Sequence, residues 1–144
     1  NMRRKARDGR VLFHYNGHGM PKATHLGEFW FFDKDRTHYV PYNINEAANV
    51  LESPTIWVFD CNSAGSLLNH WKPRGEGGSS GNLQNRTRDF MICACSEGEM
   101  LPMNPLLPAD LLTSCLTTPV KMMLEWYIHY SYRKTLLPDV TEEM

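Results

Sequence analysis

Three short apolar runs, separated by segments with helical spacing, constrain the fold of this chain more than any other feature. They cover residues 10–15 (RVLFHY), 55–60 (TIWVFD) and 89–95 (DFMICAC), and each is nearly continuous rather than alternating. Strands of this kind are typical of parallel sheets that are buried on both faces. The sequence therefore predicts an α/β fold with a mainly parallel sheet and helices on both faces.

Turn and helix signals fill the segments between these runs. Residues 28–33 and 37–40 predict a hairpin, with Pro41 on an edge strand or at its end. Residues 73–88, rich in Gly, Ser, Asn and Arg, predict a flexible loop. Helices are expected over residues 44–51 after Asn43 as the cap, over residues 67–71, from about residue 109, and over residues 119–132.

The charges nearly cancel, with 15 basic and 16 acidic residues. This balance predicts no nucleic-acid partner and no anionic membrane surface. A local excess lies at Arg3, Arg4, Lys5 and Arg7, where the sequence favours a solvated helix end over an interaction arm. No stretch reaches the roughly 18 apolar residues of a membrane helix, and no apolar signal segment follows the basic start. We therefore expect a soluble, unsecreted protein without membrane insertion.

Four cysteines, Cys61, Cys93, Cys95 and Cys115, are expected to be reduced thiols. A chain of this length with an adequate core does not need disulfides. Cys93 and Cys95 are two positions apart, a spacing that differs from that of zinc ribbons and redox sites. The loops also lack the Gly-rich patterns of nucleotide-binding sites. The sequence therefore predicts no metal and no cofactor.

Two loops that follow predicted strands carry residues that could take part in catalysis. His18 lies in a loop between two glycines, Gly17 and Gly19, and is a candidate general base. Cys61 directly follows the strand over residues 55–60, and amide groups at the start of the next helix could hold an oxyanion. The carboxyl ends of parallel strands meet at one edge of a sheet. The two loops therefore have the topology of a Cys–His dyad.

A purely structural interpretation of the same residues stays open. A cysteine at a buried strand end usually behaves as a small apolar residue, and His18 can be an ordinary loop histidine. Asp60, if it is buried at the strand end, needs hydrogen-bond partners, which makes it an organiser of the turn before an acid or base. His14 is expected on the face of the sheet opposite its neighbours, where it belongs to packing.

Three further runs stand out: residues 11–21 (VLFHYNGHGMP), 53–65 (SPTIWVFDCNSAG) and 108–120 (PADLLTSCLTTPV). They resemble the N-terminal conserved region of the raptor family, the scaffolds of TOR kinase complexes. The resemblance covers nearly the whole chain, and it implies that residues 1–144 are part of a caspase-like three-layer sandwich. The loop over residues 73–88 carries no resemblance. Neither end looks like a natural terminus, so we expect a piece of a longer protein.

The first two runs are also where raptor proteins resemble caspases and metacaspases. Metacaspases carry their histidine in a YSGHG-like loop, which residues 15–19 match well. Their nucleophile lies in a DSCHSG-like turn, and aligning DCNSAG with it places Asp60 on the acid, Cys61 one position before the nucleophile and Asn62 on the nucleophile. A shift of one residue turns a side chain to the opposite face. Cys61 should therefore point away from His18, and Asn62 cannot act as a nucleophile.

The resemblance thus implies a pseudo-peptidase with no catalytic residue, in which His18 and Asn62 are vestigial dyad positions with Cys61 and Asp60 adjacent. It also implies a scaffold or adaptor that binds the TOR kinase and other TOR-complex subunits. Such a scaffold presents substrates that carry a TOR signalling motif. It would be cytoplasmic, with recruitment to the lysosome or vacuole surface as part of the complex.

Two points stay open on the sequence. The docking groove for substrates can include residues 97–108 or the last helices as one wall, but no pocket residue can be assigned. The alternative function is a caspase-like cysteine endopeptidase that uses a His18/Cys61 dyad, with Gly19 and Gly65 shaping the oxyanion site.

Overall fold

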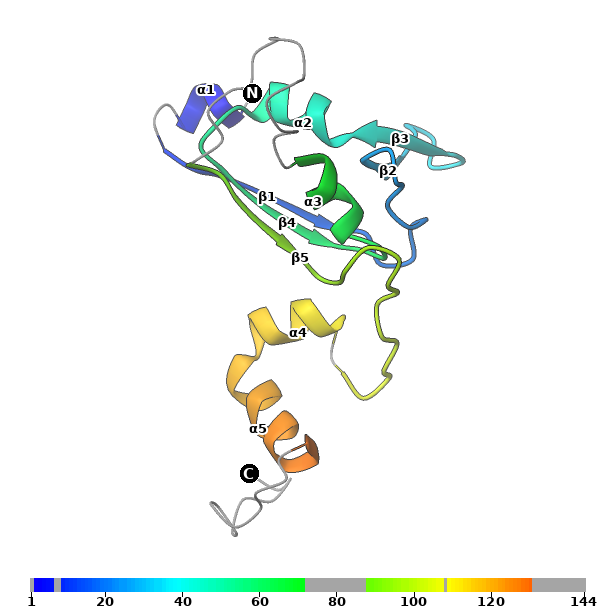
Figure 1. The fold of residues 1–144 in the computed structure, drawn as a ribbon, viewed down its shortest axis with the longest axis vertical. Coiled ribbons are helices and arrows are strands. Elements are labelled where there is room, and N and C mark those ends of the chain that lie inside the picture. Colours follow the sequence, from blue (N-terminus) through cyan, green and yellow to red (C-terminus); the bar gives the residue numbers. More distant parts are fainter. Residues whose placement is uncertain (1, 7–8, 72–87, 108, 131–144) are drawn as a thin grey trace. The chain divides into compact units, whose positions relative to one another are not determined.

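The computed structural model of the chain describes residues 2–6, 9–71, 88–107 and 109–130 (Figure 1). In chain order the elements are α1 (Met2–Ala6), β1 (Val11–Asn16), β2 (Glu28–Phe32), β3 (Tyr39–Asn43), α2 (Ile44–Leu51), β4 (Thr55–Asp60), α3 (Gly65–Trp71), β5 (Phe90–Cys93), α4 (Leu111–Thr117) and α5 (Pro119–Tyr130). They fall into two compact units, Asn1–Leu101 and Pro102–Met144.

A parallel sheet forms the centre of the first unit. Its order is β1-β4-β5, and both neighbouring pairs are parallel. β1 and β4 pair along their full lengths, from Val11 opposite Thr55 to Asn16 opposite Asp60. The predicted α/β class with a mainly parallel sheet is confirmed. Predicted and observed bounds agree for β4, whereas β5 is shorter than the apolar run that predicted it.

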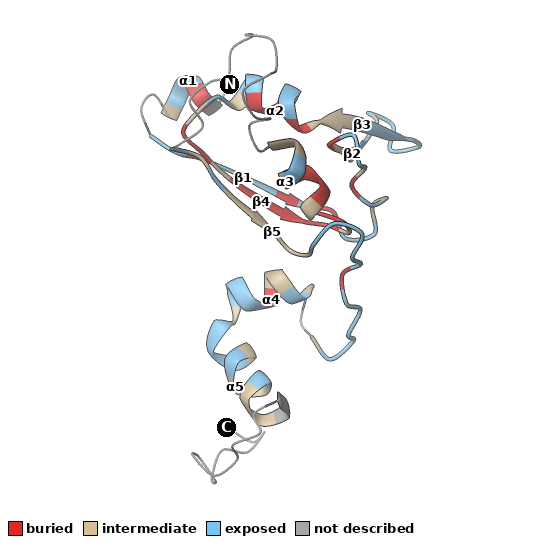
Figure 2. Cartoon of the chain, in the orientation of Figure 1, coloured by how far each residue is buried: buried red, intermediate tan, exposed pale blue. Residues whose placement is uncertain are grey.

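The register divides the sheet into two different faces. The first face carries an aromatic cluster made of Phe13, Tyr15, Trp57 and Phe59. Helices α2 and α3 pack on it through Ile44, Ala47, Ala48 and Leu67. On the other face Leu12 and Phe90 are 60% and 61% exposed. His14 lies on that face as predicted, but it is exposed rather than packed. Figure 2 shows β4 coloured as buried over most of its length.

The main hydrophobic cluster therefore lies on one side of the sheet. Trp57 and Phe59 are 0% exposed, and their rings stack with centroids 6.1 Å apart. Burial of each ring contributes roughly 2–3 kcal/mol relative to exposure. Phe29 of the hairpin contacts Phe59 edge-on, with ring centroids 5.3 Å apart. This contact joins the hairpin to the same core.

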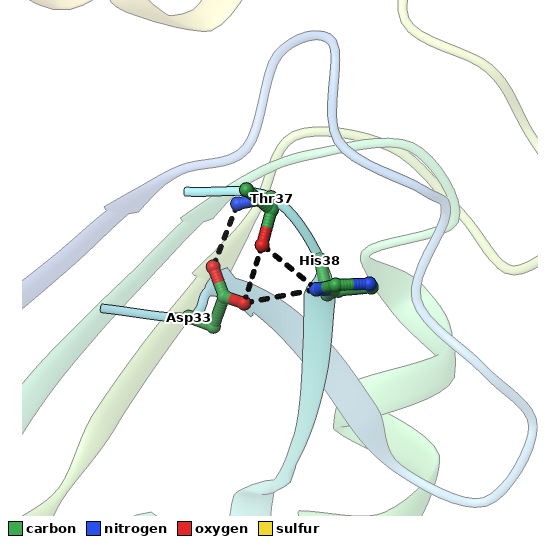
Figure 3. A network of polar contacts seen from close by, with 3 residues as sticks. All are labelled: Asp33, Thr37 and His38. Atoms are coloured by element: carbon green, nitrogen blue, oxygen red, sulfur yellow. Dashed lines mark hydrogen bonds and ion pairs between the residues drawn. The ribbon is translucent and has the colours of Figure 1, made fainter. Parts of the chain in front are cut away.

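The hairpin of β2 and β3 is confirmed, but its second strand begins at Tyr39 and continues through Pro41, later than the sequence indicated. The cause lies in the turn (Figure 3), where the Asp33 carboxylate accepts hydrogen bonds from Thr37 N at 2.7 Å and Thr37 Oγ1 at 3.0 Å. His38 Nδ1 lies 3.1 Å from the same carboxylate. These contacts keep Thr37 and His38 in the turn, and the Thr37 amide above all lowers the pKa of Asp33.

The helices follow the predicted signals closely. Asn43 caps α2, since its side-chain oxygen accepts from Asn45 N at 2.9 Å. Helix α4 begins at Leu111, two positions after the expected start, with Asp110 as its N-cap residue. The predicted loop over residues 73–88 lies outside the described residues apart from its last position. None of the described helices has the length and apolar character needed to cross a membrane.

Arg3 corrects one interpretation of the basic start. It is only 7% exposed, although Arg4 and Lys5 are solvated as expected. Its guanidinium donates to the carbonyl oxygens of Leu51 (2.6 Å), Gly9 (2.9 Å), Glu52 (3.0 Å) and Pro54 (2.7 Å) and to Thr55 Oγ1 (2.9 Å). The planar fork of donors matches a turn whose carbonyls converge. Arg3 therefore ties α1 to the segment that leads into β4.

Candidate functional site

The two loops singled out by the sequence meet at the carboxyl edge of the sheet. β1 and β4 end side by side, with Asn16 paired to Asp60. The first residue after β1, Gly17, donates its N–H to the Asp60 carbonyl at 2.8 Å. Asp60 is 0% exposed at this strand end, and its role as an organiser of the turn stays a prediction. The His18 loop and the turn over residues 61–65 are therefore fixed next to each other.

The glycines beside His18 have structural causes. A Cβ atom on Gly17 would lie 2.4 Å from the ring of Tyr15 and 2.7 Å from Cys61 Cβ. Gly19 has a φ of 78°, in the left-handed region that favours glycine. His18 itself is exposed, and its N–H donates to Asn16 Oδ1 at 3.3 Å. The two glycines of the Gly-His-Gly pattern are thus explained by packing and turn geometry without a substrate.

Cys61 belongs to the hydrophobic core. Its side chain is 1% exposed and lies in the cluster that includes Tyr15 and Phe59. Burial above all, together with the charges of Cys95, Cys93 and Asp60, raises the pKa of the Cys61 thiol to about 12. Only about one molecule in 10⁵ would carry the thiolate at pH 7. All four cysteines of the chain are free thiols.

Asn62, the residue in the nucleophile register, is half-buried and makes two contacts through its oxygens. Its side-chain Oδ1 accepts from Leu101 N at 2.7 Å. Its carbonyl accepts from Ala23 N at 2.9 Å. The carboxamide therefore binds a main-chain amide from a segment almost forty positions later in the chain.

That later segment, residues 95–101, lies along the turn, and we call it the strap. Ser63 N donates to the Glu99 carbonyl at 2.7 Å, and Gly65 N donates to the Cys95 carbonyl at 3.0 Å. These two amides belong to the group that the sequence suggested as oxyanion donors. A Cβ on Gly65 would lie 2.5 Å from Glu97 N. Gly65 therefore admits the strap, and its amide is already used.

Sequence reasoning missed the strap because each of its hydrogen bonds to the turn uses a main-chain group on at least one side, and main-chain groups leave no pattern in the sequence. Two signals were nevertheless present. Asn62 and Ser63 are residues whose short polar side chains commonly bond to the backbone. The glycine at position 98 permits the tight turn that the strap makes there, with a φ of 79°. The strap meets the turn at a place that the sequence could not specify.

The described residues contain no cluster of three or more His, Cys, Asp or Glu side chains that could hold a metal. An open cavity of about 660 Å³ lies beside α3, and its lining includes Leu68, Cys93, Glu97 and Glu99. Its two carboxylates already have partners: Asn69 Nδ2 donates to Glu97 at 2.6 Å, and Ser96 N donates to Glu99 at 2.7 Å. The cavity shows no arrangement of groups that suggests catalysis.

Comparison with known proteins shows which family this chain is similar to. The family described as "Raptor N-terminal CASPase like domain" matches residues 1–71. The chain is 44% identical over 141 residues to "Regulatory-associated protein of TOR 1" of Arabidopsis thaliana, covering 98% of this chain and 10% of that protein. It is 39% identical over 138 residues to "Target of rapamycin complex 1 subunit mip1" of Schizosaccharomyces pombe, covering 88% and 10%.

A solved structure is similar as well. The crystal structure of Chaetomium thermophilum Raptor superimposes with a TM-score of 0.70 at 41% identity, covering 88% of this chain and 11% of that chain. The chain thus spans about a tenth of the length of the curated relatives it matches. The chain belongs to the raptor family and carries part of its N-terminal caspase-like region.

Proposed function

We propose that residues 1–144 are part of a caspase-like pseudo-peptidase domain in a non-catalytic scaffold subunit of a TOR kinase complex. The subunit recruits substrates that carry a TOR signalling motif and presents them to the kinase. Its partners are the TOR kinase, these substrates and other subunits of the complex, with no nucleic acid and no membrane insertion. It acts in the cytoplasm and reaches the lysosome or vacuole surface within the complex.

The observation that carries this proposal is the similarity along nearly the whole chain to proteins named as TOR regulators. The matched protein of Schizosaccharomyces pombe is named as a subunit of target of rapamycin complex 1. The matched proteins of Arabidopsis thaliana and Saccharomyces cerevisiae carry corresponding names, at 44% and 36% identity. Names of this kind describe a regulatory subunit, which supports a role in assembly over a role in peptide cleavage.

The chemistry of the strand-end turn supports the pseudo-peptidase part. Asn62 stands in the nucleophile register and has a carboxamide, which is not a nucleophile at neutral pH. Cys61 is buried, and its raised pKa keeps it protonated. The amides of Ser63 and Gly65 donate to carbonyls of the strap. The same three facts count against an endopeptidase with a His18/Cys61 dyad.

Recovery of partners tests the proposal directly. The full-length protein with an affinity tag is isolated from lysate of its native cells, and the co-purifying proteins are identified by mass spectrometry. We expect a TOR-type kinase in the wild-type sample and an equal amount with His18→Ala, because the proposal gives this histidine no catalytic task. Absence of such a kinase from the wild-type sample would remove the scaffold proposal.

Substrate presentation needs a separate measurement. A peptide with a TOR signalling motif is immobilised beside a peptide of the same composition in scrambled order. The full-length protein should bind the first and not the second. Equal binding to both peptides would contradict recruitment through the motif, whatever the result with the kinase.

A further inference from the structure

Five hydrogen bonds attach the strap to the turn, one of them from Cys95 Sγ to the Cys61 carbonyl at 3.3 Å. Leu101 N donates to Asn62 Oδ1 at 2.7 Å, and Gly98 N donates to Ser63 Oγ at 2.8 Å. In the opposite direction, Ser63 N and Gly65 N donate to carbonyls of the strap at 2.7 and 3.0 Å. Donors and acceptors therefore alternate between the two segments, which resembles a short stretch of strand pairing without regular sheet geometry.

The backbone of the turn is shaped for this contact. Ser63 has a φ of 59°, a conformation that is unfavourable for a residue with a side chain. In this conformation Ser63 contacts the strap with both its N–H and its hydroxyl, and the residue is only 4% exposed. A contact that holds a residue in a strained conformation must itself be stable.

The strap also has a defined end. Leu101 is 7% exposed, and it is the last residue of the compact unit Asn1–Leu101. The residue before it, Met100, is 64% exposed. Glu97 and Glu99, the two carboxylate residues of the strap, are exposed as well. Asn62 therefore anchors the point at which the chain leaves the unit, directly after a segment that displays its side chains to solvent.

We infer that the turn over residues 61–65 is a latch for the strap, and that Asn62 is the positioning residue of this latch. Through its Oδ1, and with Ser63, it holds residues 95–101 across amides that a peptidase would keep free for its substrate. The vestigial site is thus occupied by its own chain, and it serves to fix the strap. This inference rests on the proposed pseudo-peptidase function and adds a task for the residue that replaced the nucleophile.

Amide hydrogen exchange in the full-length protein, read by mass spectrometry with residue-level fragmentation, tests the latch. Asn62→Leu removes the acceptor at similar size, and the Leu101 amide should exchange roughly ten-fold faster, as expected for one lost buried hydrogen bond. Asn62→Asp keeps an acceptor oxygen in place and should restore slow exchange. Ser63→Ala should accelerate exchange at Gly98 and leave Leu101 protected.

Asn69→Leu is the matched control, because Asn69 also binds the strap, by donating to the Glu97 side chain at 2.6 Å, but lies outside the turn over residues 61–65. It should leave Leu101 exchange unchanged. Equal Leu101 exchange in wild type and Asn62→Leu would overturn the inference, and so would an Asn62→Asp variant that exchanges as fast as Asn62→Leu. These readings do not require the kinase, so a failure to recover the kinase would reject the proposed function and leave the test of the latch intact.

Discussion

Alkylation of Cys61 separates the scaffold from the endopeptidase, because the two functions require opposite states of this thiol. Burial and neighbouring charges raise its pKa to about 12 from the ordinary value of 9.0. Each pKa unit changes the thiolate fraction about tenfold at a pH below both values. At about pH 8 the fraction falls from roughly one in ten to roughly one in 10⁴. The thiolate fraction alone therefore slows alkylation about 1000-fold, and the 1% exposure of the side chain slows it further.

The assay is a time course with iodoacetamide at about pH 8, where thiolate chemistry is measurable. Samples are quenched, digested and mapped by mass spectrometry, so that each cysteine gives its own rate. Cys115 is an exposed free thiol and provides the reference within the same molecule. In denaturant the rates of Cys61 and Cys115 should become similar, because the protection of Cys61 depends on the fold.

One result would refute this reasoning. A catalytic thiol is activated by its histidine and reacts faster than an ordinary cysteine. If Cys61 reacts as fast as Cys115 or faster, and His18→Ala slows it, the His18/Cys61 dyad exists and the scaffold proposal loses its chemical basis. If Cys61 is slow and His18→Ala leaves its rate unchanged, the dyad is excluded.

Three further predictions concern stability and the turn, the first two measured by urea unfolding with tryptophan fluorescence. Arg3→Met should lower the free energy of unfolding by about 3 kcal/mol, because it leaves buried carbonyls without their charged donor, whereas exposed Arg4→Met should change it by about 0.5 kcal/mol or less; equal effects would contradict the buried network. The contribution of Cys61 and Cys93 to the free energy of unfolding should be constant below about pH 9 and fall as the pH rises toward 12, because these thiols, with pKa values raised to about 12 and 11, keep protons that the unfolded chain releases; Cys61→Ala should make the decline shallower. Asn62→Cys should gain no cleavage of peptide substrates, and any cleavage that requires His18 would argue against the occupied turn.

Much of the fold could be predicted from local sequence. The run TIWVFD is β-branched and aromatic up to its terminal Asp60, so its burial and its bounds as β4 followed directly. Asn43 before an apolar helical pattern gave the start of α2 for an equally local reason. The start of β3 could not be predicted in this way. It depends on the Asp33 contacts with Thr37 and His38, which extend the turn beyond what hydrophobic pattern indicates.

The position of the site could be predicted from the sequence, but the hydrogen bonds that its turn makes could not. Parallel strands bring their carboxyl ends to one edge, so the sequence alone predicted that the loops after Tyr15 and Asp60 lie together. The amides of the turn donate to carbonyls of the strap. The strap lies thirty or more positions later in the chain, and the sequence does not indicate that the two segments meet. Arg3 is a comparable case. A basic residue in a charged run is predicted to be solvated, whereas the guanidinium of Arg3 is surrounded by carbonyls that it binds.

A motif that looks catalytic can therefore be maintained by packing alone. Gly17 leaves room for Tyr15 and Cys61, and a Cβ in its place would meet both at less than 3 Å, at 2.4 and 2.7 Å. Cys61 in turn fills the core position that the alternation after β4 assigns to the first residue of the turn. The Gly-His-Gly loop and the adjacent cysteine are thus coupled through their buried sides. The resemblance to metacaspases aligns position 62 with the nucleophile, and at this position the carboxamide of Asn62 accepts a hydrogen bond from the Leu101 amide.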